Sequence, residues 1–183
     1  MIEEWENEGG YVRPERFRIM HVIPKFEGEH FFLSNFYEAP TDFLMDGEKV
    51  TMPTGEHAFQ AAKCHALVDM TQKQEYVRRV ADAPTPSKAK YEGRSCRIAI
   101  DKWDHIKVDC MREVVFQKFL QHTDIRGDLL ATGDAMLVEG NTWGDTFWGR
   151  VDGKGYNKLG VILMETRGWW LWQGRRNRPE MGS

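Results

Sequence analysis

The segment LVEGNTWGDTFWGR, residues 137–150, joins two tryptophans and several polar side chains on a backbone that contains three glycines. Glycine lets a backbone turn sharply or approach a ligand closely. The ring faces of Trp143 and Trp148 are suited to stacking on a base or a sugar. Asp145, between them, could hold a sugar hydroxyl, activate water or stabilise positive charge on an anomeric carbon. The alternative is structural, with two indoles that close the core and Asp145 capping a turn.

A second candidate set lies in TGEHAFQAAK, residues 54–63, where alanines favour a helix and Thr54 is a natural N-cap. Glu56, Gln60 and Lys63 follow at i, i+4 and i+7, so they share one helix face. At 1.5 Å per residue, the backbones of Glu56 and Lys63 are about 10 Å apart, and their long side chains could close on one ligand. The alternative is a solvated polar face. The helix start is expected to favour the ionised form of Glu56.

Two further segments carry weaker signals. In PSKAKYEGR, residues 86–94, Lys90 and Arg94 stand at i, i+4 and could clamp a phosphate, although exposed helix cations are common. Asn35 and Phe36 interrupt the aromatic run FFLSNFY. Asn35 either contacts a ligand or bonds its own backbone.

The composition describes an ordinary globular domain of 183 residues with a formal net charge of −3. An acidic balance gives no broad attraction to nucleic acid or to anionic membranes. Three cysteines without a CxxC pair fit reduced thiols, and we see neither a secretion signal nor a membrane-spanning run, so we expect a cytoplasmic protein. His57 lies on another helix face and is expected to be a core or surface residue. No metal-ligand spacing accompanies it, so we predict no metal and no cofactor.

These side chains must be positioned by short elements whose boundaries the hydrophobic periodicity and the turn residues indicate. We predict extended segments at 16–23, 30–52 around the MDGEKV turn, and 136–140, and helices at 54–67, 71–83, 86–94 with a stop at Gly93, 101–122, 125–133 and 157–170. The fold class is α+β, mostly helical with a few short strands, in a single domain. We divide the chain into an N-terminal leader and first strand (1–24), the domain (25–170) and a polar basic C-terminal tail (171–183).

Eight segments resemble, in order, the motifs of the NADAR superfamily, which includes the YbiA-like N-glycosidases. The match runs from about Phe31 to Arg167. The segments are FFLSNFY, TGEHAFQAAK, AKYEGR, KWDHIKVDCM, FQKF, LLATG, LVEGNTWGDTFWGR and YNKLGVILMETR.

The resemblance implies a YbiA-like fold and an N-glycosidase that hydrolyses the C–N bond between a phosphorylated ribose and a base, as in riboflavin biosynthesis intermediates. One alternative is an ADP-ribosyl glycohydrolase that removes ADP-ribose from guanine in modified nucleic acid. Another is a non-catalytic ADP-ribose binding module. The expected partner is a small phosphoribosyl or ADP-ribosyl molecule, with no membrane contact.

The resemblance also assigns roles to residues of this chain. Glu56, Lys63 and Asp145 are the expected catalytic residues, with Glu56 ionised and Asp145 orienting ribose hydroxyls or water. Lys63 either holds phosphate or forms a Schiff base with ring-opened ribose. The predicted substrate-binding residues are Asn35, Phe36, Gln60, Lys90, Arg94, Trp103, Trp143, Trp148 and Asn157, the last at a helix N-terminus suited to an anion.

Overall fold

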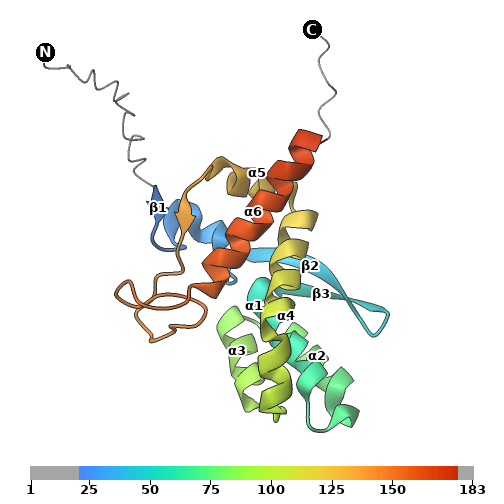
Figure 1. The fold of residues 1–183 in the computed structure, drawn as a ribbon. Coiled ribbons are helices and arrows are strands. Elements are labelled where there is room, and N and C mark those ends of the chain that lie inside the picture. Colours follow the sequence, from blue (N-terminus) through green and yellow to red (C-terminus); the bar gives the residue numbers. More distant parts are fainter. Residues whose placement is uncertain (1–20, 177–183) are drawn as a thin grey trace, which may run out of the picture.

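The computed structural model describes residues 21–176, and Figure 1 shows how their elements are arranged. In chain order, with η for a 3-10 helix, the elements are β1 (Val22–Ile23), η1 (Gly28–Leu33), β2 (Glu38–Met45), β3 (Glu48–Thr54), α1 (Gly55–Ala61), η2 (Ala62–Ala66), η3 (Met70–Gln72), α2 (Lys73–Ala81), α3 (Pro86–Ser95), α4 (Ile100–Gln121), α5 (Thr123–Ala131), β4 (Met136–Leu137) and α6 (Lys158–Arg176). The predicted α+β class, mostly helical with few short strands, is confirmed. Of the strand expected at 16–23, Val22 and Ile23 form β1, His21 is not part of a strand, and residues 16–20 lie outside the described residues, as do the acidic leader and the end of the basic tail.

Strands β2 and β3 form an antiparallel hairpin that projects from the helices (Figure 1). The turn residues Asp46 and Gly47 have φ of 54° and 84°. Two positive φ values give a turn whose twist matches that of paired strands. Met45 and Glu48 pair directly across it, so the turn predicted in MDGEKV is confirmed.

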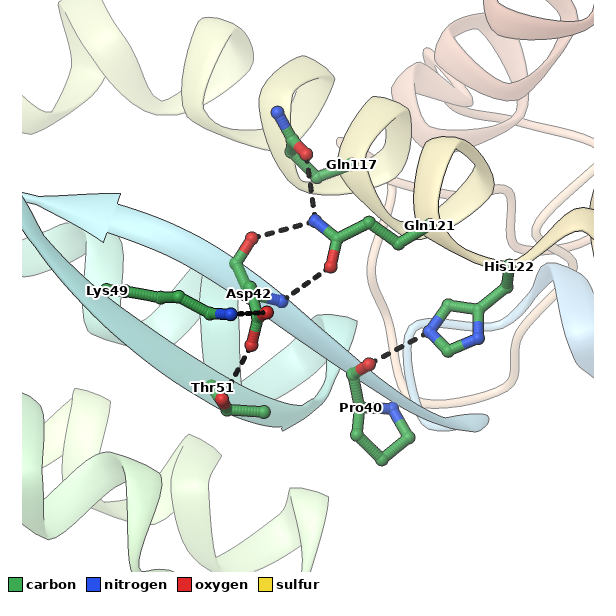
Figure 2. Close-up of polar contacts among 7 residues, drawn as sticks. All are labelled: Pro40, Asp42, Lys49, Thr51, Gln117, Gln121 and His122. Atoms are coloured by element: carbon green, nitrogen blue, oxygen red, sulfur yellow. Dashed lines mark hydrogen bonds and ion pairs between the residues drawn. The ribbon is translucent and has the colours of Figure 1, made fainter.

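The other edge of β2 is bonded to the end of α4 by side chains (Figure 2). The Gln121 amide donates through Nε2 to the Asp42 carbonyl (2.8 Å) and accepts at Oε1 from the Asp42 amide N–H (2.9 Å). One residue along, the ring of His122 hydrogen-bonds the Pro40 carbonyl at 2.9 Å. These bonds occupy backbone groups that a neighbouring strand would otherwise pair, so the edge of the hairpin is covered.

The helices pack around α1 and α4. Helix α1 contacts α2, α3 and α4, and α6 contacts α4, α5 and β4. Helix α6 continues beyond its expected end at Trp170 to Arg176, and within this extension the Arg176 guanidinium lies 5.2 Å from the ring centroid of Trp172. No helix within residues 21–176 has both the length and the hydrophobicity to cross a membrane.

The expectation that α3 stops at Gly93 is wrong, because the helix continues to Ser95. Gly93 is buried in the contact between α3 and α1, where a Cβ atom would overlap the side chain of Gln60. The glycine therefore serves the close approach of two helices and does not mark a helix end.

The expected extended backbone is also wrong for residues 30–33, which belong to the 3-10 helix η1. The Lys118 side chain of α4 is fully buried beneath the end of this helix. Its Nζ donates to the carbonyls of Phe32 (2.6 Å) and Ser34 (2.9 Å). An amine from a residue distant in the sequence thus satisfies carbonyl groups that a short helix leaves free at its C-terminus.

Candidate active site

A cavity of about 1270 Å³ opens between α1, α3, the first half of α4, the segment after η1 and the glycine-rich loop at 139–148. Every predicted site residue except Asn157 lines it. These residues are Asn35, Phe36, Glu56, Gln60, Lys63, Lys90, Arg94, Trp103, Trp143, Asp145 and Trp148. Segments as far apart as residues 35 and 148 therefore meet around one space, while the roles of the individual side chains stay predictions.

Glu56 stands in the first turn of α1, whose predicted N-cap Thr54 accepts from the amide of His57. The Glu56 N–H donates to the Asn35 carbonyl (2.8 Å), and Oε1 accepts from Gln60 Nε2 (2.8 Å). Burial raises the pKa of the Glu56 carboxyl, although the cations of Lys90 and Lys63 oppose this shift. The expected lowering of the Glu56 pKa at the helix start is therefore not seen, because desolvation is the largest effect on this carboxyl.

Lys63 lies in η2, because the expected helix at 54–67 tightens after Ala61. Its Nζ donates to the Gly93 carbonyl at 2.8 Å and lies 5.9 Å from the ring centroid of Trp103. Burial lowers the pKa of the Lys63 amine, although Glu56 opposes this shift. An amine held this way is easier to deprotonate than a surface lysine, which suits a nucleophile better than a purely electrostatic anchor.

Asp145 both caps its loop and lines the cavity. Its N–H donates to Asn141 Oδ1 (3.0 Å), and Asn141 Nδ2 donates to its carbonyl (2.8 Å). Its own Oδ1 accepts from the amides of Phe147 (3.0 Å) and Trp148 (2.8 Å). The alternative in which Asp145 caps a turn therefore holds for one of its two carboxylate oxygens. The bonds also fix the direction of the second oxygen, which is a useful property in a ligand-binding group.

The tryptophans differ in their placement. Trp103 is buried, and Trp148 is half-buried; both contact Phe59, with ring centroids 5.3 Å and 5.2 Å from it. They form one aromatic wall together with Phe59, which the sequence motifs did not single out. Trp143 is 65% exposed and lies at the rim. A ligand that stacks on Trp143 would thus extend toward solvent.

The cations of α3 face the same space. Lys90 Nζ lies 6.0 Å from the ring centroid of Phe36, and Arg94 is exposed at the rim. His57 is buried elsewhere and bonds Thr54 and the Ala83 carbonyl, as expected for a core histidine. No group of His, Cys, Asp and Glu within residues 21–176 is arranged to hold a metal ion.

The expectation of an anion site formed by Asn157 is wrong. Asn157 is buried, its Oδ1 accepts from the Glu139 N–H (3.0 Å), and its Nδ2 donates to the Leu137 carbonyl (2.8 Å). The first N–H groups of α6 are also used, because Lys158 and Leu159 donate to the carbonyls of Phe147 and Trp148. Asn157 and the helix start hold the glycine-rich loop in place.

Glu139 is a cavity residue that motif spacing did not single out. Its Oε2 atom is buried and has no hydrogen-bond partner within residues 21–176. Burial and the nearby charge of Asp145 raise the pKa of the Glu139 carboxyl to about 7. The available signal was its position: it closely follows a buried strand and begins the glycine-rich loop.

Comparisons with known proteins agree on one family. Residues 24–169 match the NADAR domain. N-glycosidase YbiA of Escherichia coli strain K12 is 37% identical over 163 residues, covering 82% of this chain and 92% of that protein. Riboflavin biosynthesis protein VVA0006 of Vibrio vulnificus is 40% identical over 139 residues, covering 75% of this chain and 35% of that protein. The NMR structure of E. coli YbiA superimposes with a TM-score of 0.67 at 33% identity, covering 90% of this chain and 96% of that one.

Proposed function

The chain belongs to the NADAR domain family, and from this membership we propose that it is an N-glycosidase acting on a base joined to a phosphorylated ribose. The family resemblance expected from eight sequence motifs is confirmed by the match over residues 24–169. One observation carries the proposal: a single cavity is lined by carboxyls from two distant segments, a partly desolvated amine and indole rings.

The reaction explains why this set of groups is useful. Breaking a C–N glycosidic bond builds positive charge on the ribose and negative charge on the departing nitrogen. A carboxylate beside the sugar stabilises the positive charge. We propose this role for Glu56, whose ionised form is stabilised by the nearby cations of Lys90 and Lys63. Asp145, fixed through one oxygen, orients a ribose hydroxyl or the attacking water with the other.

Lys63 has two alternative roles, and an experiment can distinguish them. Its desolvated amine can add to C1 of the ring-opened ribosyl group and expel the base, which leaves a Schiff base that water then hydrolyses to ribose 5-phosphate and the free amine. Alternatively, it can hold phosphate as a cation. Borohydride reduction during turnover, followed by mass spectrometry, distinguishes them: only the first role gives a ribosyl adduct on Lys63.

The substrate is proposed from the relatives and from the cavity. Proteins named for riboflavin biosynthesis are among the relatives, which favours an aminopyrimidine bearing ribose 5-phosphate. The volume of about 1270 Å³ exceeds the 300–1,000 Å³ common for small-ligand pockets, which favours ADP-ribosylated guanine as a second candidate.

A direct assay tests the proposal. The protein is incubated with 5-phosphoribosyl aminopyrimidine and, separately, with ADP-ribosylated guanosine, and release of the free base is followed by chromatography. Glu56→Gln and Asp145→Asn are each expected to lower turnover at least about 100-fold. Glu75→Gln, which changes an exposed carboxylate on α2, is the matched control and should have no effect. Binding of ADP-ribose without release from either substrate would make the protein a reader module and refute the enzyme.

A further inference from the structure

Glu139 is held at the wall of the cavity through its backbone. Its N–H donates to Asn157 Oδ1 (3.0 Å), and its carbonyl accepts from the Arg150 N–H (2.9 Å). Gly149 lies so close that a Cβ atom there would overlap the Glu139 carbonyl. The backbone position is therefore fixed from three sides, and the carboxyl is directed by it.

The carboxyl of Glu139 has an unmet hydrogen-bonding need. Within residues 21–176, its Oε2 is shielded from solvent and has no partner, whereas Oε1 of Glu56 is bonded to Gln60. Buried polar atoms without partners are rare in folded proteins, and those that occur call for a functional explanation. A ligand atom in the cavity would supply the missing partner.

Glu56 has mainly cations near it, whereas Glu139 has mainly carboxylates near it. Glu56 is close to two cations, Lys90 and Lys63. Around Glu139 the carboxylates of Asp145, Glu27 and Glu56 disfavour ionisation, and among these neighbouring groups the cation of Lys90 opposes them. When two acids share a site in unlike surroundings, the one among anions keeps its proton. These surroundings favour the protonated form of Glu139, whereas Lys90 and Lys63 favour the ionised form of Glu56.

We infer that Glu139 is a further catalytic residue, whose carboxylic acid protonates the departing base nitrogen while the bond from that nitrogen to C1 of the ribose breaks. This role rests on the proposed N-glycosidase function. The bonding electron pair leaves with nitrogen, which takes the proton, and Glu139 becomes a carboxylate. Water then adds its oxygen to C1 and returns one proton to Glu139, so the enzyme is restored and the products are the free base and ribose 5-phosphate.

Two substrates that differ in their need for a proton test this role. The first is 5-phosphoribosyl aminopyrimidine, whose amine leaves poorly unless protonated. The second is 4-nitrophenyl β-ribofuranoside 5-phosphate, whose phenolate leaves unaided. Glu139→Gln is expected to lower kcat at least about 100-fold on the first and less than about tenfold on the second. Asp145→Asn, the control that removes an orienting carboxylate, should lower both alike.

The pH dependence of the wild-type enzyme gives a second test that needs no variant. Turnover of the aminopyrimidine should fall above a pH of about 7, where Glu139 loses its proton, and turnover of the nitrophenyl compound should not. Equal losses on both substrates in Glu139→Gln, or the same pH limb with both, would overturn the assignment while leaving the glycosidase intact. A wild-type protein that releases no base from aminopyrimidine or guanosine substrates would instead refute the proposed function, and this role with it.

Discussion

Replacing Lys118 by methionine removes a buried amine and should change how stability depends on pH. The amine is fully buried at the end of η1 and donates to the carbonyls of Phe32 and Ser34. Burial lowers the pKa of Lys118 from 10.5 to about 7. Between these two values the unfolded chain binds a proton that the folded protein does not. The free energy of unfolding contributed by this group therefore rises with pH across that window.

The size of the effect follows from the two pKa values. Each pH unit in the window contributes about 1.36 kcal/mol. From pH 7 to pH 9.5, allowing for half-protonation at the lower end, wild type should gain about 3 kcal/mol over Lys118→Met. Lys118→Met also leaves the two carbonyls without their donor, which lowers its free energy of unfolding by an amount that does not change with pH.

Urea unfolding at pH 7, 8 and 9.5 measures this difference. All other titrating groups are common to the two proteins and cancel when their stabilities are subtracted. Lys102→Met, an exposed lysine on the same helix, is the matched control and should follow wild type at every pH. A constant difference between wild type and Lys118→Met across the pH range would mean that the amine is not desolvated, and the reasoning would be wrong.

Two further variants test the site and its support. Gly93→Ala should push the Gln60 side chain away from Glu56 and lower kcat/KM by about tenfold or more, as expected for a lost hydrogen bond to a carboxylate. The control is Gly127→Ala on α5, where a Cβ meets nothing within 4 Å, and it should leave turnover unchanged. Unchanged kcat/KM in Gly93→Ala would show that Gln60 does not support Glu56. Glu139→Gln should be more stable than wild type above pH 7 by up to about 3 kcal/mol, because the raised pKa of Glu139 makes wild type lose stability as pH rises from 4.5 to about 7. Thermal unfolding at pH 5 and pH 8 measures this, and an equal difference at both pH values would contradict it.

Local signals predicted the helix carrying Glu56 well. An N-cap threonine and an alanine-rich run are short-range features, and both act within one turn. The i, i+4 relation of Glu56 and Gln60 was visible for the same reason and appears as a hydrogen bond of 2.8 Å. The cavity itself was expected from family motifs, because nothing in the spacing of residues 35 and 148 places them together.

The errors came from interactions with distant parts of the chain. Gly93 resembles a helix stop locally, but its contact with Gln60 on another helix decides its use. The 3-10 helix η1 depends on Lys118, 84 residues beyond Ser34. The direction of the Glu56 pKa shift required knowledge of burial, which a single helix face does not reveal. Glu139 was overlooked, although it lies in the segment 137–150, because nothing local in the sequence indicates that its carboxyl is buried.

The bonds from the start of α6 to the glycine-rich loop have a consequence for truncated forms of the protein. A chain ending at Arg150 would retain Glu56, Lys63, Glu139 and Asp145, yet it would lack the Asn157 amide and the helix N–H groups that bond this loop. It would contain all four reactive side chains, but they would no longer be correctly positioned. In the proposed reaction, turnover therefore depends on a helix that supplies none of the four, and a premature stop codon late in the reading frame should be as damaging as the loss of a reactive side chain.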